Sequence, residues 1–223
     1  MRETGSSAQN KSLKIYIIRH GETDANREGR LQGWSDWDLN EMGVLLARET
    51  GRALKGTSFD LCVTSPLKRA LQTAQIVLEE SGNGSCPLLY EDDIREINMG
   101  RYEGKLIKGD PEVDMSLARA FLYDPISCPA FPEGESISQL MERTQRFLKE
   151  LAKKDYETVL VSTHGCALRA MLNFLYENKE DFWHGHVPYN CCINIVEAEN
   201  GELKLAAEDL IFYDEALCID RYR

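Results

Sequence analysis

The sequence has no long apolar run, no paired cysteines and no apolar leader. None of its apolar runs approaches the roughly 20 residues that a membrane-spanning helix needs. The opening residues, MRETGSSAQNKS, are polar and lack the apolar core of a signal peptide, so we expect a disordered leader over residues 1–12. The seven cysteines are odd in number and form no Cys-x-x-Cys, which argues against a disulfide framework or a zinc knuckle. We therefore expect reduced thiols in a cytoplasmic protein.

Positive charge is also scarce. The chain carries 26 Lys and Arg against 37 Asp and Glu, a formal net charge of −11. A surface of this sign repels nucleic acid and anionic membranes, so we expect neither as a partner. It would also mildly repel a phosphate group. Any anion site must therefore be built locally from arginine, histidine and backbone N–H groups.

The 223 residues, 43% of them apolar, are enough for one large domain with a substantial core. Apolar runs alternate with longer helical patterns, which predicts an α/β fold: a three-layer α/β/α sandwich with a mostly parallel central sheet. Strands are expected at residues 13–18, 61–64, 88–90 and 158–161, and helices at about 40–55, 65–80, 135–154 and 165–176. Near the C-terminus, residues 192–197 and 203–207 flank Asn200-Gly201, which predicts a β-hairpin.

Helix starts and one irregular segment complete the expected domain, which spans residues 13–223. Asn40 is the expected N-cap of the first helix. Ser65 and Pro66 predict the start of the second, with serine at the N-cap and proline at the first position. Residues 100–132 are rich in glycine and proline. We expect a short insertion there, at about 104–132, over one end of the sheet, with a short helix near residues 113–123.

The ends of two buried strands carry unusual side chains. The stretches IIRHG, at residues 17–21, and VSTHG, at residues 161–165, both end in His-Gly. In an open α/β sheet, ligands bind at the carboxyl ends of the strands. A third strand leads into a helix whose first turn carries Arg69. The sequence therefore predicts that Arg19, His20, Arg69 and His164 converge.

Each of these residues alone has an ordinary explanation as a structural histidine or a solvated arginine, but together they favour a phosphate pocket. Arg69 stands where a helix start is already positive, which makes sense if both face an anion. The helix after His164 offers the N–H groups of Gly165 and Cys166. The glycines at 21 and 165 would let the backbone approach a ligand. A histidine at the pocket floor could also act as a nucleophile.

The blocks that carry these residues resemble the histidine phosphatase superfamily, the phosphoglycerate-mutase-like fold. The resemblance covers roughly residues 14–200 and rests on five segments in the family's order: RHGETDANREGRLQGWSDWDLNEMG, TSPLKRALQTA, REINMGRYEGK, PEGESISQLMERT and VSTHGCALRAML. It implies a metal-independent phosphomonoesterase that hydrolyses a small phosphorylated metabolite through a phosphohistidine, with no metal and no cofactor.

The resemblance also implies a role for each matched residue. These roles are the phosphorylated nucleophile for His20, phosphoryl binding for Arg19, Arg69, His164 and Asn26, a substrate-lining loop for Gln32 and Gly33, and the proton donor for Glu96. The implied reaction has two steps: attack by His20, then hydrolysis of the phosphohistidine by water. Glu96 must be protonated in the first step, so we expect partial burial to raise its pKa.

Two alternative functions stay open. The family also contains cofactor-dependent phosphoglycerate mutases, which carry a longer basic segment after the acid block. In this chain the corresponding segment, residues 96–134, is short, and its basic residues are scattered, which favours a phosphatase. The second alternative is a catalytically inactive, phosphate-binding regulatory module, but the nucleophile and both arginines are present.

Two loop histidines, one cysteine and two tryptophans each have a structural and a functional explanation. His184-x-His186 could bind a metal, but no cysteine or carboxylate has ligand spacing, so we favour ordinary loop histidines. We expect Cys166, Trp34 and Trp37 to serve mainly in packing. The sequence does not name the phosphomonoester, and a homodimer is a further option.

Overall fold

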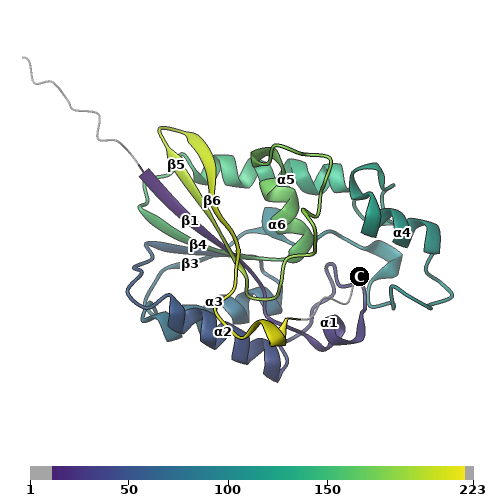
Figure 1. The fold of residues 1–223 in the computed structure, drawn as a ribbon, viewed down its shortest axis with the longest axis horizontal. Helices are drawn as coiled ribbons and strands as arrows, with labels where there is room; N and C mark the ends of the chain where they lie inside the picture. The colour runs from purple at the N-terminus through teal and green to yellow at the C-terminus, as the bar shows by residue number, and fades with distance from the viewer. Residues whose placement is uncertain (1–11, 219–223) are drawn as a thin grey trace, which may run out of the picture.

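A computed structural model describes residues 12–218, and its six strands form one sheet in the order β3-β2-β4-β1-β5-β6 (Figure 1). The strands are β1 (Ser12–Arg19), β2 (Leu61–Thr64), β3 (Leu88–Tyr90), β4 (Thr158–Thr163), β5 (Ile193–Glu199) and β6 (Glu202–Leu210). The first four run parallel, and β5 and β6 are antiparallel, as the predicted hairpin requires. Of the leader expected over residues 1–12, residues 1–11 lie outside the described residues, and Ser12 belongs to β1.

Helices cover both faces of the sheet, as the α/β pattern predicted. The α-helices are α1 (Asp24–Glu28), α2 (Glu41–Ala53), α3 (Lys68–Ser81), α4 (Met115–Tyr123), α5 (Ile137–Leu151) and α6 (Gly165–Leu172). Short 3-10 helices lie at Asp92–Ile94, Gly100–Tyr102, Pro125–Ser127, Asn173–Leu175 and Glu215–Leu217. In Figure 1, α2 and α3 lie on one face of the sheet and α5 and α6 on the other. No helix within residues 12–218 is both long enough and apolar enough to cross a membrane.

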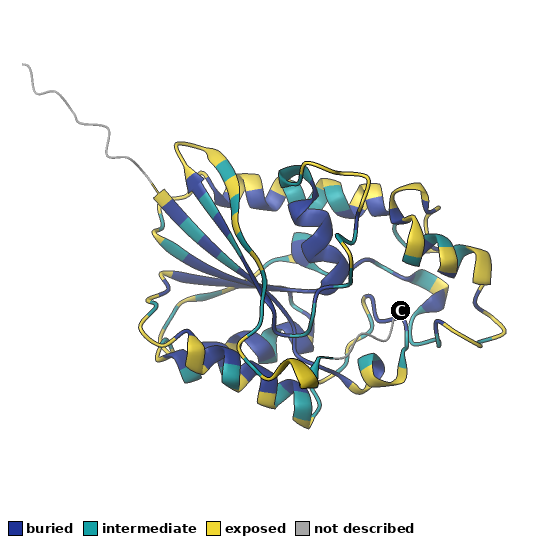
Figure 2. Ribbon diagram, in the orientation of Figure 1, coloured by how far each residue is buried: buried dark blue, intermediate teal, exposed yellow. Residues whose placement is uncertain are grey.

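The core follows the alternation of side chains along the strands. In β1, Leu13, Ile15 and Ile17 pack with Leu148 and other residues of α5 and α6. Ile18, on the opposite side, packs with residues of α2 and α3. Because successive strand residues point to opposite faces, one buried strand serves both layers. Figure 2 shows this buried interior running through the sheet and the inner sides of the helices.

The helix starts agree with the sequence in one case and differ in another. Asn40 caps α2 as expected, because its side chain accepts a 2.9 Å hydrogen bond from the N–H of Gly43. The prediction for Ser65 was wrong: α3 begins at Lys68, and Leu67 occupies its N-cap with no side-chain cap. The Ser65 hydroxyl lies instead 2.8 Å from Nε2 of a histidine at the end of β4.

The expected insertion lies past the carboxyl ends of the parallel strands (Figure 1). The helix expected near residues 113–123 is α4. It belongs to a third hydrophobic cluster, separate from the two that flank the sheet, and this cluster includes Phe121, Phe131 and Tyr102. This cluster also includes Leu31, Cys166 and Ala167. The insertion is therefore packed against the end of the sheet, where the strand-end residues lie.

Candidate active site

The predicted convergence at the strand ends follows from the order of the sheet. β1 and β4 are neighbours, and Arg19 is paired with Thr163 in their register. His20 and His164 therefore leave the sheet side by side, with ring centroids 5.2 Å apart. β2 lies on the other side of β4 and leads into α3, which carries the fully buried Arg69. Both Arg19 and Arg69 lower the pKa of His20 electrostatically, so all four side chains share one region.

His20 is held in the form that a nucleophile needs. Its Nδ1 lies 2.7 Å from the carbonyl oxygen of Gly21, and an acceptor there requires Nδ1 to carry the proton. Nε2 is then left with its lone pair. Burial, followed by the charges of Arg69 and Arg19, lowers the pKa of His20 well below its ordinary value. The imidazole is therefore neutral at physiological pH.

The two arginines are oriented by carbonyl oxygens rather than by carboxylates. Arg69 donates to the carbonyls of Gly33 at 2.6 Å and Ser35 at 2.8 Å, and Arg19 donates to that of Pro188. Burial lowers the pKa of Arg69 to about 10, so it stays charged near neutrality. In the described chain, Nε of each arginine and Nδ1 of His164 are buried without a hydrogen-bond partner. The two Nε–H donors suit an anion with several acceptor oxygens, and Nδ1 of His164 is a third donor when Nε2 accepts from the Ser65 hydroxyl.

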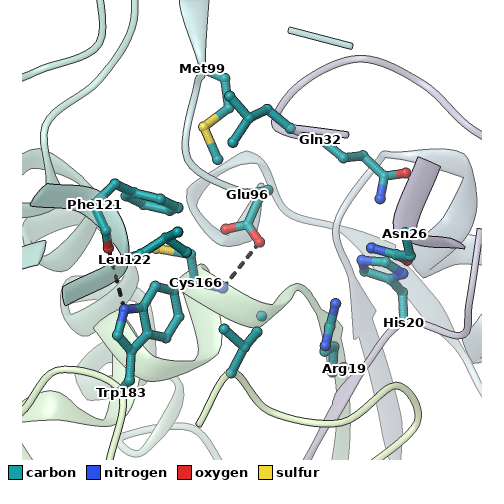
Figure 3. A pocket seen from close by; sticks show the side chains of 13 residues that line it. Arg19, His20, Asn26, Gln32, Glu96, Met99, Phe121, Leu122, Cys166 and Trp183 are labelled. Carbon is teal, nitrogen blue, oxygen red and sulfur yellow. Dashed lines mark hydrogen bonds between the residues drawn. The ribbon is translucent and has the colours of Figure 1, made fainter. Parts of the chain in front are cut away.

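Glu96 lies at the N-terminus of α6, and its carboxylate accepts three backbone N–H groups. The donors are Cys166 at 3.0 Å, Ala167 at 2.9 Å and Ile97 at 2.9 Å. Burial nevertheless raises the pKa of Glu96, in the direction that we expected, against these bonds and the charge of Arg69. The expectation that the Cys166 N–H binds the anion is not met, because Glu96 already takes it (Figure 3).

The backbone around Glu96 is held by side chains that the sequence did not single out. The guanidinium of Arg143, on α5, donates to the carbonyls of Asp93 at 2.8 Å, Arg95 at 2.7 Å and Glu96 at 2.9 Å. It also forms a two-point ion pair with Glu135, in which Nε and Nη2 donate to the two carboxylate oxygens at 2.7 and 2.8 Å. All five N–H bonds of the guanidinium are thus used.

A second carboxylate, Glu103, organises the loop that holds Arg69. It accepts the backbone N–H groups of Gly33 at 3.1 Å, Trp34 at 2.7 Å, Ser35 at 3.0 Å and Met99 at 3.0 Å. A Cβ at position 33 would lie 2.3 Å from the carbonyl oxygen of Ile97, so only glycine fits there. In this structure Gly33 therefore contributes its carbonyl to Arg69.

The remaining residues expected from the family resemblance also lie at this site. Asn26 and Gln32 line the same cavity as His20, and both are oriented by Thr23. Gly21 differs from expectation. Its N–H donates to Thr73 at 2.9 Å, and a Cβ there would lie 2.6 Å from the carbonyl oxygen of Gly43. The glycine thus permits close packing on α2 rather than on a ligand.

The cavity has one polar side and one apolar side (Figure 3). Arg19, His20, Asn26 and Gln32 lie on the polar side, and Glu96 lies between the two. Six apolar residues that line the cavity are here named the apolar wall: Leu31, Met99, Phe121, Leu122, Trp183 and Val187. Phe121, Leu122 and Trp183 lie across the cavity from His20 (Figure 3). Gly165 and Cys166 also line the cavity. Burial raises the pKa of the Cys166 thiol well above its ordinary value, so it stays protonated, in keeping with packing.

The other two histidines do not line the cavity. His184 stacks on Tyr176 with centroids 3.5 Å apart, and His186 stacks on Tyr189 at 4.6 Å. Within residues 12–218, no three His, Cys, Asp or Glu side chains form a group that could hold a metal ion. Trp34 does more than pack, because its Nε1 donates to the carbonyl oxygen of Glu96 at 2.8 Å.

Paired histidines, two buried arginines and a protonatable carboxylate at the carboxyl edge of a parallel sheet are typical of α/β enzymes that act on phosphoryl groups through a histidine. The model of the histidine phosphatase superfamily (branch 1) matches residues 15–209. The chain belongs to this superfamily, which confirms the resemblance seen in the sequence.

Individual relatives include both phosphatases and mutases. The chain is 33% identical over 189 residues to the Bacillus subtilis protein named "Uncharacterized phosphatase PhoE", covering 83% of this chain and 89% of that protein. It is 33% identical over 166 residues to the 2,3-bisphosphoglycerate-dependent phosphoglycerate mutase of Methylobacterium sp. (strain 4-46), covering 72% and 79%. Among solved structures, Bacillus stearothermophilus YhfR has a TM-score of 0.82 at 29% identity, covering 89% of this chain and 98% of that chain.

Proposed function

We propose that this protein is a metal-independent phosphomonoesterase that hydrolyses a small phosphorylated metabolite through a phosphohistidine on Nε2 of His20. The observation that carries the proposal is the state of this imidazole. It is buried and neutral, its Nδ1 is fixed on the carbonyl of Gly21, and it lines a cavity together with Arg19 and Glu96. This places a nucleophile, an anion-binding group and a proton donor around one space.

In the first step, Nε2 of His20 attacks the phosphorus in line with the leaving oxygen. The P–N bond forms, the P–O bond breaks, and protonated Glu96 gives its proton to the departing alcohol. Arg19, Arg69 and His164 stabilise the charge on the equatorial oxygens. The raised pKa of Glu96 fits this role, because burial favours the protonated carboxyl.

In the second step, a water molecule attacks the phosphohistidine. Glu96, now a carboxylate, accepts a proton from that water, the P–N bond breaks, and inorganic phosphate leaves. Glu96 and His20 return to their starting protonation states. One carboxyl therefore serves as the acid and then as the base.

Hydrolysis is favoured over a mutase reaction by the basic residues of the insertion. Arg101 pairs with Glu133 at 2.5 Å, and Lys105 pairs with Glu112. Neither of these two cations lines the cavity, nor do Lys108 and Arg119, the other basic residues of this segment. A mutase must retain a phosphate ester that also carries a free carboxylate between two transfers, and a cation is needed to hold that carboxylate. The mutase stays the second candidate, because the Methylobacterium relative carries that name.

Phosphate release from a panel of phosphomonoesters, measured with a chelator present, tests the proposal. We expect release by the wild type, none by His20→Ala, and unchanged release by His184→Ala, which removes a histidine that does not line the cavity. The wild type should also form an acid-labile, base-stable phosphoenzyme that the His20 variant lacks. Isomerisation of phosphoglycerate without net phosphate release would favour the mutase, and chelator-sensitive release would contradict metal independence.

A further inference from the structure

The apolar wall of the cavity has no task in the phosphoryl chemistry. Among the described residues that line the cavity, the ionisable side chains besides the Cys166 thiol are Arg19, His20 and Glu96. All three are assigned to the phosphoryl group and the leaving oxygen. Asn26 is also assigned to the phosphoryl group, and Gln32 is the one further polar side chain among the described lining residues. Most of the lining left for the part of the substrate that carries the phosphate is therefore the apolar wall.

Nearby cations are already engaged with other groups and do not line the cavity. Arg143 uses all its donors on Glu135 and three carbonyls. Arg101 and Lys105, in the insertion, are paired with glutamates. Arg95 lies over the ring of Trp34, 5.1 Å from its centroid. A substrate carboxylate would therefore lose its water without gaining a cationic partner, which is costly.

The apolar wall is preformed by ring packing. Phe121, on α4, makes edge-to-face contacts with Phe131 at 5.2 Å and Trp183 at 5.7 Å between centroids. Trp183 packs in the same way on Phe182 at 4.9 Å, and its Nε1 donates to the carbonyl of Phe121 at 3.3 Å. Rings held on several sides lose little freedom when a ligand binds. They offer an apolar substrate its burial energy at little ordering cost.

From these observations we infer that the substrates are phosphomonoesters of an uncharged, apolar alcohol, aromatic or aliphatic, rather than phosphoglycerates or phosphoamino acids. The inference rests on the proposed phosphatase function, since it names the group that this phosphatase removes the phosphate from. Phe121, Leu122 and Trp183 are the specificity-determining residues, because they come from the insertion and from the loop after α6 and touch the alcohol alone.

The test compares 2-phenylethyl phosphate with O-phosphoserine and 3-phosphoglycerate. All three release a primary alcohol, so differences in kcat/KM report on the pocket rather than on leaving-group chemistry. We expect kcat/KM to favour the phenylethyl ester by about 10- to 100-fold, the ratio that follows from burying one aromatic ring. The same ordering should appear in the dissociation constants of His20→Ala, measured by calorimetry, where no turnover occurs.

Two variants with the same new charge locate the effect. Leu122→Lys puts an ammonium into the apolar wall, whereas Tyr123→Lys puts it one residue further along α4, on a side chain that is 73% exposed. We expect Leu122→Lys to lose at least about 10-fold on the phenylethyl ester and to gain on 3-phosphoglycerate. Tyr123→Lys should leave both unchanged. Inhibition by inorganic phosphate checks that each variant keeps its phosphate site.

The outcomes separate the two levels of the proposal. If no ester is hydrolysed but His20→Ala binds the phenylethyl ester more tightly, the phosphatase function fails and the specificity stands. If esters are hydrolysed but the charged ones are equal or better, the specificity is overturned and the phosphatase stands. Equal responses of the two lysine variants would also overturn it. If Leu122→Lys does not fold, the wild-type ratio and the His20→Ala affinities decide alone.

Discussion

Replacing Arg143 by methionine should disable the proposed acid Glu96 without touching the cavity. Methionine keeps much of the side-chain length but removes the two-point ion pair with Glu135 and the three bonds to the carbonyls of residues 93, 95 and 96. The side chains of Arg143 and Glu135 are only 12% and 15% exposed. Breaking a pair this buried costs about 3–5 kcal/mol, so we expect about 3 kcal/mol less free energy of unfolding.

The kinetic consequence depends on the leaving group. A shift of the acid by about 1 Å can lower a rate about 100-fold, and we expect that loss in kcat/KM for an alkyl phosphate. An aryl ester such as p-nitrophenyl phosphate has a leaving oxygen that departs without a proton. For that ester the loss should stay below about 10-fold. The assay is kcat/KM for both esters, because this ratio reports on formation of the phosphoenzyme.

Arg146→Met is the matched control. Arg146 lies one turn further along α5 and pairs with the side chain of Asp93 at 2.8 Å, but its side chain is 56% exposed. Exposed pairs contribute at most about 1 kcal/mol, so this variant should keep both activities within about twofold. Equal losses on the two esters in Arg143→Met would refute the reasoning, because they would show general destabilisation rather than a displaced acid.

Three further predictions follow from the burial of the site. Burial raises the pKa of Glu96, so single-turnover phosphorylation by an alkyl ester should persist above the pH at which an ordinary glutamate loses its proton. The rate should then fall as the pH rises through the raised pKa of Glu96. Glu96→Gln should abolish both the phosphorylation rate and this fall at high pH. Burial and two arginines lower the pKa of His20, so the phosphorylation rate should not fall on acidification through pH ~6.5, the ordinary pKa of histidine. A fall in the rate near that pH would contradict a neutral nucleophile. Glu103→Gln leaves one acceptor oxygen for four backbone N–H groups. We expect the free energy of unfolding, measured by calorimetry, to fall by about 2 kcal/mol and the inhibition constant of phosphate to rise. Glu133→Gln, on a side chain that is 65% exposed, should change neither quantity.

The sequence predicted the sheet well because buried parallel strands are short apolar runs with sharp ends. The bounds of β2 and β3 match the expectation, and β4 runs two residues further than expected, to Thr163. The extension was missed because Ser162 and Thr163 are polar. Their hydroxyls donate to the carbonyls of Ala70 and Ile94, each at 2.8 Å, which lets them stay in a buried strand.

The supporting residues could not be predicted in the same way. Arg143 and Glu103 act on backbone atoms tens of residues away, and no local spacing signals such a contact. The prediction for Ser65 was wrong for a related reason. A serine before a proline is typical of an N-cap, and only the fold brings His164 close enough to form a hydrogen bond with the Ser65 hydroxyl. α1 was missed too, because five residues carry little periodicity, although Thr23 and Asn26 form its capping box.

The way the site holds its charges explains how a chain of net charge −11 can bind a phosphate. Arg19 and Arg69 are oriented by neutral carbonyls, which fix their direction without cancelling their charge. The charge of Glu103 is directed at four backbone N–H groups. Glu96, the one acid among the described residues that line the cavity, is favoured by burial in its neutral form. The approaching phosphate therefore meets Arg19 in the cavity lining, and the charge of the buried Arg69 also acts on this region. The charge of the phosphate in turn keeps the proton on Glu96 that the leaving alcohol needs.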